Sequence, residues 1–136
     1  MLKYLLDTNV ISEPLRLIPN SRIMQNLEQY SSEIALPSVV IHELFVGCYK
    51  LPPSVKRATI EKFLHAISLP VLPYDQAAAK WHAIERVRLS SLGRTPPFVD
   101  GQIAAIAFTQ NLTLVTLNQA DFSSYDGLKI VDWSSY

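Results

Sequence analysis

The sequence predicts an α/β fold with a central parallel sheet and helices on both of its faces. Short apolar segments of strand-forming residues alternate along the chain with longer segments of helical periodicity. Strands that alternate with helices are joined by crossover connections, and such connections make neighbouring strands parallel. A length of 136 residues suits one domain with a substantial core, so we expect residues 1–136 to form a single domain.

The predicted strands are short runs of apolar residues bounded by polar residues or proline. The clearest is LTLVTL, and a weaker one, VLP, is either a strand or an extended link. In chain order the predicted strands are residues 3–6 (KYLL), 34–36 (IAL), 71–73 (VLP), 112–117 (LTLVTL) and 129–131 (KIV).

The predicted helices follow these strands, and several carry a recognisable start or stop signal. Thr8 is a candidate N-cap for the first helix, Ser38 caps the third, and Gly93 is placed as a C-terminal glycine cap. In chain order the predicted helices are residues 8–15, 21–30, 39–50, 53–67, 75–92, and a last one from Val99 or Asp100 to Gln110.

The composition is that of a soluble globular protein, with 49% hydrophobic and 18% charged residues. No apolar run is long enough to span a membrane, and a signal-peptide pattern is not expected at the N-terminus. The single cysteine, Cys48, cannot form an internal disulfide, so we expect a reducing cytoplasm. Because it lies in an apolar segment, we expect Cys48 to be a small core residue. The formal net charge is zero, which argues against a protein that coats nucleic acid non-specifically but allows a nuclease with a local basic patch.

Two aspartates follow predicted strands. Asp7 comes directly after the first strand, and Asp121 follows LTLVTL by four residues. Because ligands of open α/β sheets bind beyond the carboxyl ends of the strands, both belong to the edge where chemistry is expected. Either could instead be a turn or cap residue. Since Thr8 can fill the cap position, we interpret Asp7 as functional.

Two further acids lie on predicted helices. On a helical wheel Asp100 shares the apolar face with Ile103 and Ala107, and a carboxylate that points inward must be hydrogen-bonded, paired or bound to metal. A helix-start acid that interacts with the macrodipole is its alternative interpretation. Glu43 lies in the apolar segment SVVIHELFVGCYKL at the border of the polar side, so a solvated glutamate is equally compatible with the pattern.

Together these acids predict a metal site. Several carboxylates at one edge cannot all ionise without a compensating cation. Oxygen ligands select Mg²⁺ or Mn²⁺, and none of the three histidines has the spacing of a zinc site. A Mg²⁺ ion held by carboxylates suits phosphodiester hydrolysis.

At these residues the sequence resembles the PIN-domain family, and within it the VapC-like toxins of type II toxin–antitoxin pairs. The resemblance covers essentially the whole chain. It rests on four segments in the family's order, namely LLDTN (residues 5–9), PSVVIHEL (37–44), DGQIAAIA (100–107) and TLNQADF (116–122). The GR-x-P segment that begins at Gly93 also resembles a subset of these toxins.

The resemblance implies a three-layer α/β/α fold and a Mg²⁺- or Mn²⁺-dependent endoribonuclease. It implies a homodimer, an RNA substrate and a VapB-like antitoxin that blocks the cleft. The implied metal and catalytic residues are Asp7, Glu43, Asp100 and Asp121, and the residues implied to orient them are Thr8, Asn9, Thr116 and Asn118.

Basic residues of the 75–92 helix and the segment after it are candidate contacts for RNA or the antitoxin. We select Arg94 and Arg88 as candidates and expect Arg86 to be solvated or paired with Glu85. The apolar stripe of Trp81, Ile84 and Leu92 on this helix is expected to belong to the core.

Three rivals are compatible with parts of the pattern. A phosphotransferase of the haloacid dehalogenase type would need a second aspartate where Asn9 stands, and a structure-specific 5′ nuclease would need additional DNA-binding elements. A PIN-domain protein of RNA processing, or a non-catalytic scaffold that binds RNA or protein, remains open. The RNA target is not predicted by any motif.

Overall fold

The computed structural model describes residues 1–135 and confirms the α/β class. Its five strands are all parallel and lie in the order β3-β2-β1-β4-β5. The strands are β1 (Tyr4–Leu6), β2 (Ile34–Pro37), β3 (Val71–Leu72), β4 (Thr113–Val115) and β5 (Ile130–Val131).

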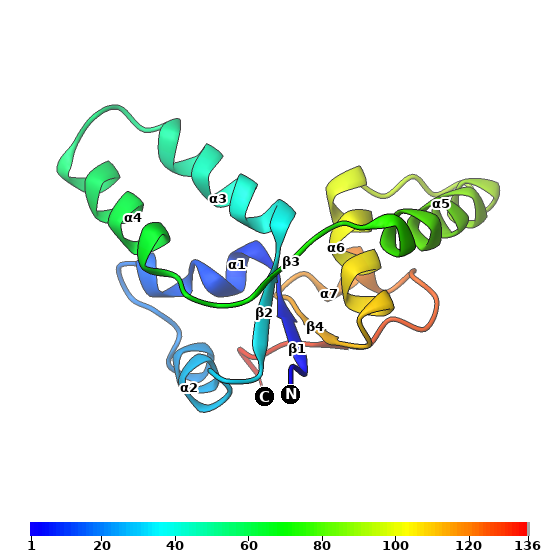
Figure 1. Ribbon diagram of the computed structural model, residues 1–136, viewed down its shortest axis with the longest axis horizontal. Coiled ribbons are helices and arrows are strands. Elements are labelled where there is room, and N and C mark those ends of the chain that lie inside the picture. Colours follow the sequence, from blue (N-terminus) through cyan, green and yellow to red (C-terminus); the bar gives the residue numbers. More distant parts are fainter. Residues whose placement is uncertain (136) are drawn as a thin grey trace.

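The helices flank the sheet in two groups (Figure 1). One group, α1 to α4, lies on the left of the view, and α5 to α7 lie on the right. The helices are α1 (Thr8–Ile11), the 3-10 turn η1 (Glu13–Leu15), α2 (Ser21–Gln29), α3 (Ser38–Tyr49), α4 (Val55–Ala66), α5 (Gln76–Ser91), α6 (Phe98–Thr109) and α7 (Gln119–Phe122).

The strand order fixes where the site can lie. From β1 the chain moves outward through β2 to β3, and then returns to the other side of β1 with β4 and β5. Neighbouring strands whose connections leave in opposite directions form a topological switch point, the usual ligand position in an open α/β sheet. Here that point lies between β1 and β4.

Several predicted boundaries are corrected by capping. The first predicted helix is divided, because Pro14 lies at the start of η1. Asp7, and not Thr8, is the N-cap of α1. Ser38 is already helical and gives no side-chain cap, and α4 begins after Ser54, whose hydroxyl accepts the Arg57 backbone N–H.

The core is built from both faces of the sheet. Leu5 and Leu6 of β1 and Leu114 of β4 are fully buried, and α6 lies against them with an almost entirely apolar sequence. Cys48 is buried, as predicted. The prediction that Ile84 and Leu92 belong to the core is wrong, because they are 59% and 61% exposed.

The α5–α6 pair packs unusually closely at one point. Gly101 lies against the ring of buried His82, so a Cβ atom at this position would overlap the imidazole. His82 also contacts the Phe98 ring, with 4.9 Å between centroids, and its Nδ1 shares a hydrogen bond of 2.8 Å with the Tyr74 hydroxyl. These contacts fix the first turn of α6, which carries Asp100. Among the described residues, no helix has both the length and the hydrophobicity needed to cross a membrane.

Candidate active site

Asp7 and Thr116 meet at the switch point because β1 and β4 run in parallel register. Leu6 pairs with Val115, so the next residue of each strand lies beside the other. The Thr116 hydroxyl donates to Asp7 Oδ2 at 2.8 Å, across 109 positions of sequence. Thr116 is fully buried and Asp7 is 7% exposed. The sheet therefore places a nearly buried carboxylate at its functional edge.

A chain of hydrogen bonds fixes the orientation of Asp7. The Asn118 backbone N–H donates to Thr116 Oγ1 at 3.0 Å, so the hydroxyl hydrogen of Thr116 is free to point at Asp7. The other carboxylate oxygen, Asp7 Oδ1, accepts the Thr8 backbone N–H at 2.8 Å. Burial raises the pKa of Asp7, these two hydrogen bonds oppose the rise, and the Asp121 charge adds to it.

Glu43 enters the site from α3. It is half-buried, and its Oε1 accepts a hydrogen bond of 3.0 Å from the Thr8 hydroxyl. Thr8 thus serves two acids, Asp7 through its backbone N–H and Glu43 through its side chain. A Cβ atom at Gly47, one turn further along α3, would meet nothing within 4 Å. The space beside Glu43 is therefore open.

Asp100 connects the four acids electrostatically. It is half-buried in the first turn of α6, next to the buried residues Ile103 and Ala104. Burial, followed by the charges of Asp7, Asp121 and Glu43 in that order, raises the pKa of Asp100 to about 6. All four predicted acids therefore lie within electrostatic range of one another. Asp121 is the exposed member and lies on the short helix α7.

The residues predicted to orient the acids divide into two groups. Thr8 and Thr116 hold carboxylates directly. Asn118 acts through its backbone N–H on Thr116. Asn9 is exposed, and within residues 1–135 it makes no hydrogen bond to an acid of the cluster. The predicted role of Asn9 therefore stays a prediction.

The donor chemistry of the cluster fits a hard cation. In the part of the chain that the structure describes, no three His, Cys, Asp or Glu side chains form a ready-made metal-binding group. The charges of the other three acids nevertheless raise the pKa of Asp100, and no basic side chain is among the causes that act on Asp100 or Asp7. Four oxygen donors without compensation match the preference of Mg²⁺ and Mn²⁺.

Of the two alternatives predicted for Arg86, the structure shows solvation, because Arg86 is exposed and makes no ion pair among the described residues. The ion pair with Glu85 is made by Arg88, whose Nε and Nη2 donate to the two Glu85 carboxylate oxygens at 2.8 and 2.9 Å. Arg88 Nη2 also donates to the Ser124 carbonyl at 2.8 Å. These bonds give Arg88 a structural role, and its contact with RNA or antitoxin stays a prediction. Arg94 is exposed on the loop between α5 and α6.

Tyr125 is a residue near the site that sequence reasoning missed. It is 5% exposed, and burial together with the Asp100 charge raises the pKa of its hydroxyl to about 12. Its ring lies beside Trp81 and Phe122 under α5 and α7. No local motif marks Tyr125, because only the tertiary packing brings it close to Asp100.

Comparison with known proteins agrees with this geometry. The model of the PIN domain matches residues 4–128. The chain belongs to the PIN-domain family. The match includes all four acids and both strands of the switch point.

The PIN domain is similar over its whole length to two curated bacterial proteins. It is 37% identical to the tRNA(fMet)-specific endonuclease VapC of Shigella flexneri, over 98% of this chain and 100% of that protein. It is 33% identical to the toxin FitB of Neisseria gonorrhoeae, over 95% and 97% of the two chains. Among solved structures, it superposes on DNA-bound VapBC of Salmonella typhimurium with a TM-score of 0.84 and 31% identity, covering 98% and 99%. The chain is thus a PIN domain of the VapC and FitB type.

Proposed function

We propose that this PIN domain is a Mg²⁺- or Mn²⁺-dependent endoribonuclease that acts in the cytoplasm as the toxin of a VapBC-type pair. The observation that carries the proposal is the convergence of four carboxylates around Asp100 at the switch point of the sheet. The whole-length similarity to a VapC endonuclease and to the toxin FitB supports it.

In this proposal Asp7 and Asp100 hold the metal, and Glu43 and Asp121 complete the site directly or through water. A bound divalent ion supplies Lewis-acid polarisation of a phosphodiester and activation of water. The protein contributes orientation. Thr116 and the Thr8 backbone fix the two oxygens of Asp7, and the Thr8 hydroxyl fixes Glu43. Such outer partners keep ligand carboxylates in one geometry.

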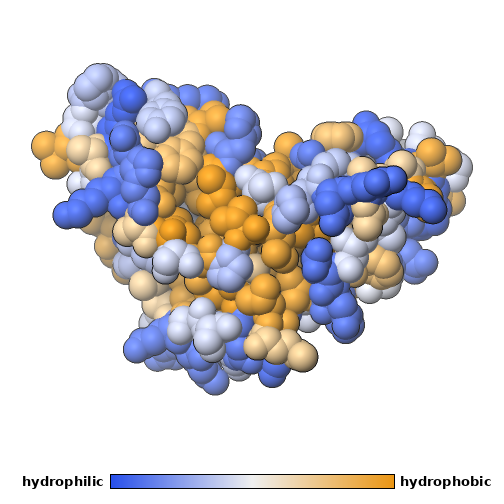
Figure 2. Space-filling view, viewed as in Figure 1, coloured by the Kyte–Doolittle hydropathy of each residue, from blue (hydrophilic) through white to orange (hydrophobic). Residues whose placement is uncertain are grey.

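The proposed partner is a VapB-like antitoxin. Solved relatives such as VapBC of Salmonella typhimurium contain both members of the pair. This chain offers an apolar groove of about 270 Å³ between α2 and α4. Figure 2 shows hydrophobic surface gathered in the hollow of this face. The groove is lined by Ile11, Pro14, Leu27, Ile34, Phe63 and Ile67. An apolar antitoxin segment placed there would lie beside α1, which carries Thr8.

The proposal also includes a homodimer. A protein of 15.3 kDa that pairs with itself would show twice that mass in solution. Light scattering after size exclusion measures this directly, and a single-chain mass across the tested concentrations would refute the dimer.

Cleavage of RNA by the purified protein tests the activity. Total RNA is incubated with Mg²⁺, Mn²⁺ or EDTA, with and without the product of a short reading frame upstream of the gene, and new 5′ ends are mapped. We expect discrete cuts with either metal, and none with EDTA or with the antitoxin. Asp7→Asn should lose at least about 100-fold, more than is typical for loss of an outer partner.

The matched control is Asp126→Asn, which removes an exposed carboxylate outside the cluster. It should cleave like the wild type. If Asp7→Asn cleaves as well as this control, the proposed site is wrong. Specific RNA binding without cleavage under any metal would instead favour a non-catalytic scaffold, and cuts confined to one precursor RNA would favour RNA processing.

A further inference from the structure

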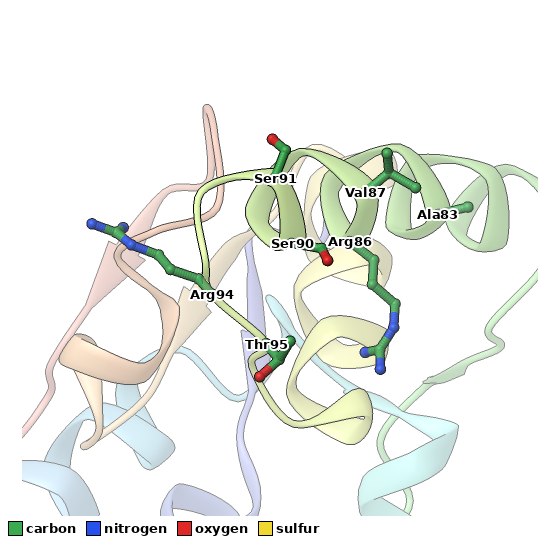
Figure 3. A pocket seen from close by; sticks show the side chains of 7 residues that line it. All are labelled: Ala83, Arg86, Val87, Ser90, Ser91, Arg94 and Thr95. Atoms are coloured by element: carbon green, nitrogen blue, oxygen red, sulfur yellow. The ribbon is translucent and has the colours of Figure 1, made fainter.

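A groove of about 590 Å³ lies along the outer side of α5 and the loop that leads to α6. In Figure 3 the side chains of Arg86 and Arg94 extend on either side of Thr95. The groove combines cations, hydroxyls and aliphatic surface, contributed by Arg86, Arg94, Ser90, Thr95, Ala83 and Val87. None of these residues belongs to the carboxylate cluster described above.

The two arginines are uncompensated. Within residues 1–135 neither Arg86 nor Arg94 makes an ion pair, in contrast to Arg88. The Arg86 guanidinium instead lies 5.5 Å from the centroid of the Phe98 ring. Phe98 is 53% exposed, although it is a large aromatic residue. The groove thus ends at an exposed aromatic ring with a cation beside it.

This aromatic end lies next to the carboxylate cluster. Phe98 opens α6, and Asp100 follows two residues later in the same turn. Tyr125 lies within electrostatic range of both the groove and the cluster, because the Asp100 charge raises the pKa of its hydroxyl and the Arg86 charge lowers it. On the other side of this turn, Val99 lines a hollow of about 390 Å³ together with His42, Glu43 and Lys50. The first turn of α6 therefore lies between Arg86 of the groove and a second cavity beside Glu43.

A polyanion needs such a groove to approach this site. Four carboxylates outweigh the charge of one bound divalent ion, and the chain as a whole has no net positive charge to attract phosphates. Guanidinium groups bind phosphate with paired hydrogen bonds, and an exposed aromatic ring can stack on a base whatever its sequence. Aliphatic walls and hydroxyls suit ribose. A carboxylate of a protein partner would pair with the arginines but would not stack on the Phe98 ring.

Resting on the function proposed above, we propose that this groove holds single-stranded RNA on one side of the scissile phosphate. Arg86 and Arg94 bind successive backbone phosphates, and Phe98 stacks on the base that enters the cluster at Asp100. The strand then passes over the first turn of α6. In this arrangement Arg86 and Phe98 bind the substrate, and RNA is the partner that Arg94 contacts.

Binding of RNA without cleavage tests the groove independently of the nuclease. The full chain in EDTA is titrated into a fluorescently labelled, unstructured oligoribonucleotide, and anisotropy gives Kd over a series of salt concentrations. The Arg86→Gln/Arg94→Gln variant should raise Kd at least about 10-fold near 0.1 M salt. Its log–log salt slope should fall in magnitude by about 1.4, roughly 0.7 for each phosphate contact on a single strand.

Two further variants make the result specific. Lys56→Gln/Lys62→Gln removes the same charge from exposed positions on α4 and should leave Kd and slope within twofold of the wild type. Phe98→Leu should weaken binding by about 5-fold or more and leave the salt slope unchanged, because stacking releases no counterion. Thermal unfolding of each variant confirms that it is folded.

Several outcomes overturn the inference. One is an arginine double variant with the Kd and slope of the α4 control. Another is a double variant that binds RNA normally but no longer binds the upstream antitoxin or no longer dimerises, which assigns the groove to a protein. RNA that binds through the groove in a chain that never cleaves supports the groove and refutes only the nuclease.

Discussion

The inner and outer faces of α5 use charge in opposite ways. On the inner face Glu85 is 5% exposed, and it accepts hydrogen bonds from Arg88 and from the Asp126 backbone N–H at 2.7 Å. On the outer face Arg86, like Arg94 of the loop that follows α5, has no acidic partner among the described residues. Arg86 and Arg88 are only two positions apart.

The difference shows what decides the role of a charged residue. Arg88 lies three residues after Glu85, which places the two side chains on one face of the helix, whereas adjacent residues such as Glu85 and Arg86 point apart. Once its guanidinium also bonds Ser124, Arg88 ties α5 to the segment after α7. Arg86 is left to face the groove. The inner face therefore maintains the fold, and the outer face is free to bind.

The largest effect should come from the apolar residues of the inner face. Leu89 is fully buried, and Leu89→Ala should lower the free energy of unfolding by about 2–5 kcal/mol because it leaves a cavity. Val87, two residues earlier, is 71% exposed, and Val87→Ala should change stability by less than about 0.5 kcal/mol. Urea unfolding measures both. Equal losses of unfolding free energy in the two variants would show that the Val87 side chain is buried in solution.

A smaller loss is expected where α5 meets α6. Gly101→Ala places a methyl group into the His82 ring and should cost about 1–3 kcal/mol, with a further loss of RNA cleavage because the turn with Asp100 must move. Gly47→Ala is the matched control, because open space surrounds that position and alanine favours helix by up to about 1 kcal/mol. The two substitutions should shift the unfolding midpoint in opposite directions. A stabilising Gly101→Ala would contradict the packing described here.

The smallest stability effect, and the most specific, should come from the ion pair. Hydrogen bonds from Arg88 hold the pKa of Glu85 below its ordinary value of 4.5. A carboxylate with a lowered pKa contributes stability that is present above its unfolded pKa and is lost as pH falls through the folded one. Glu85→Gln should therefore be less stable than the wild type at pH 7, and the difference should shrink below about pH 4.5.

Thermal unfolding between pH 7 and pH 3 measures this difference. Lys56→Gln is the control, because it removes an exposed charge of α4 that makes no ion pair among the described residues, and it should follow the wild type at every pH. A Glu85→Gln difference that is constant with pH would mean that the carboxylate charge is not what stabilises this face.

Much of the fold could be predicted from local pattern. Alternating strands and helices gave the parallel sheet, and the apolar face of the last long helix correctly placed Asp100 toward the interior. At Asp7 the cap differs from the predicted Thr8 although the helix still begins at residue 8, and the start of α4 moved by two residues because Ser54 caps it. The wheel of α5 failed for Ile84 and Leu92, since periodicity defines a stripe but not what covers it.

By itself, the sequence determined the residue types of the candidate site: four carboxylates, two of them after strands, and the two threonines that hold them, Thr8 and Thr116. Tertiary structure alone decided which atoms meet. Thr116 reaches Asp7 only because two strands 109 residues apart run in parallel register, and Thr8 reaches Glu43 only because α3 packs against α1. Tertiary structure also decided that Arg88 is bonded to Glu85 and Ser124, while Arg86 has no acidic partner among the described residues. Burial and partners are properties of the packed molecule.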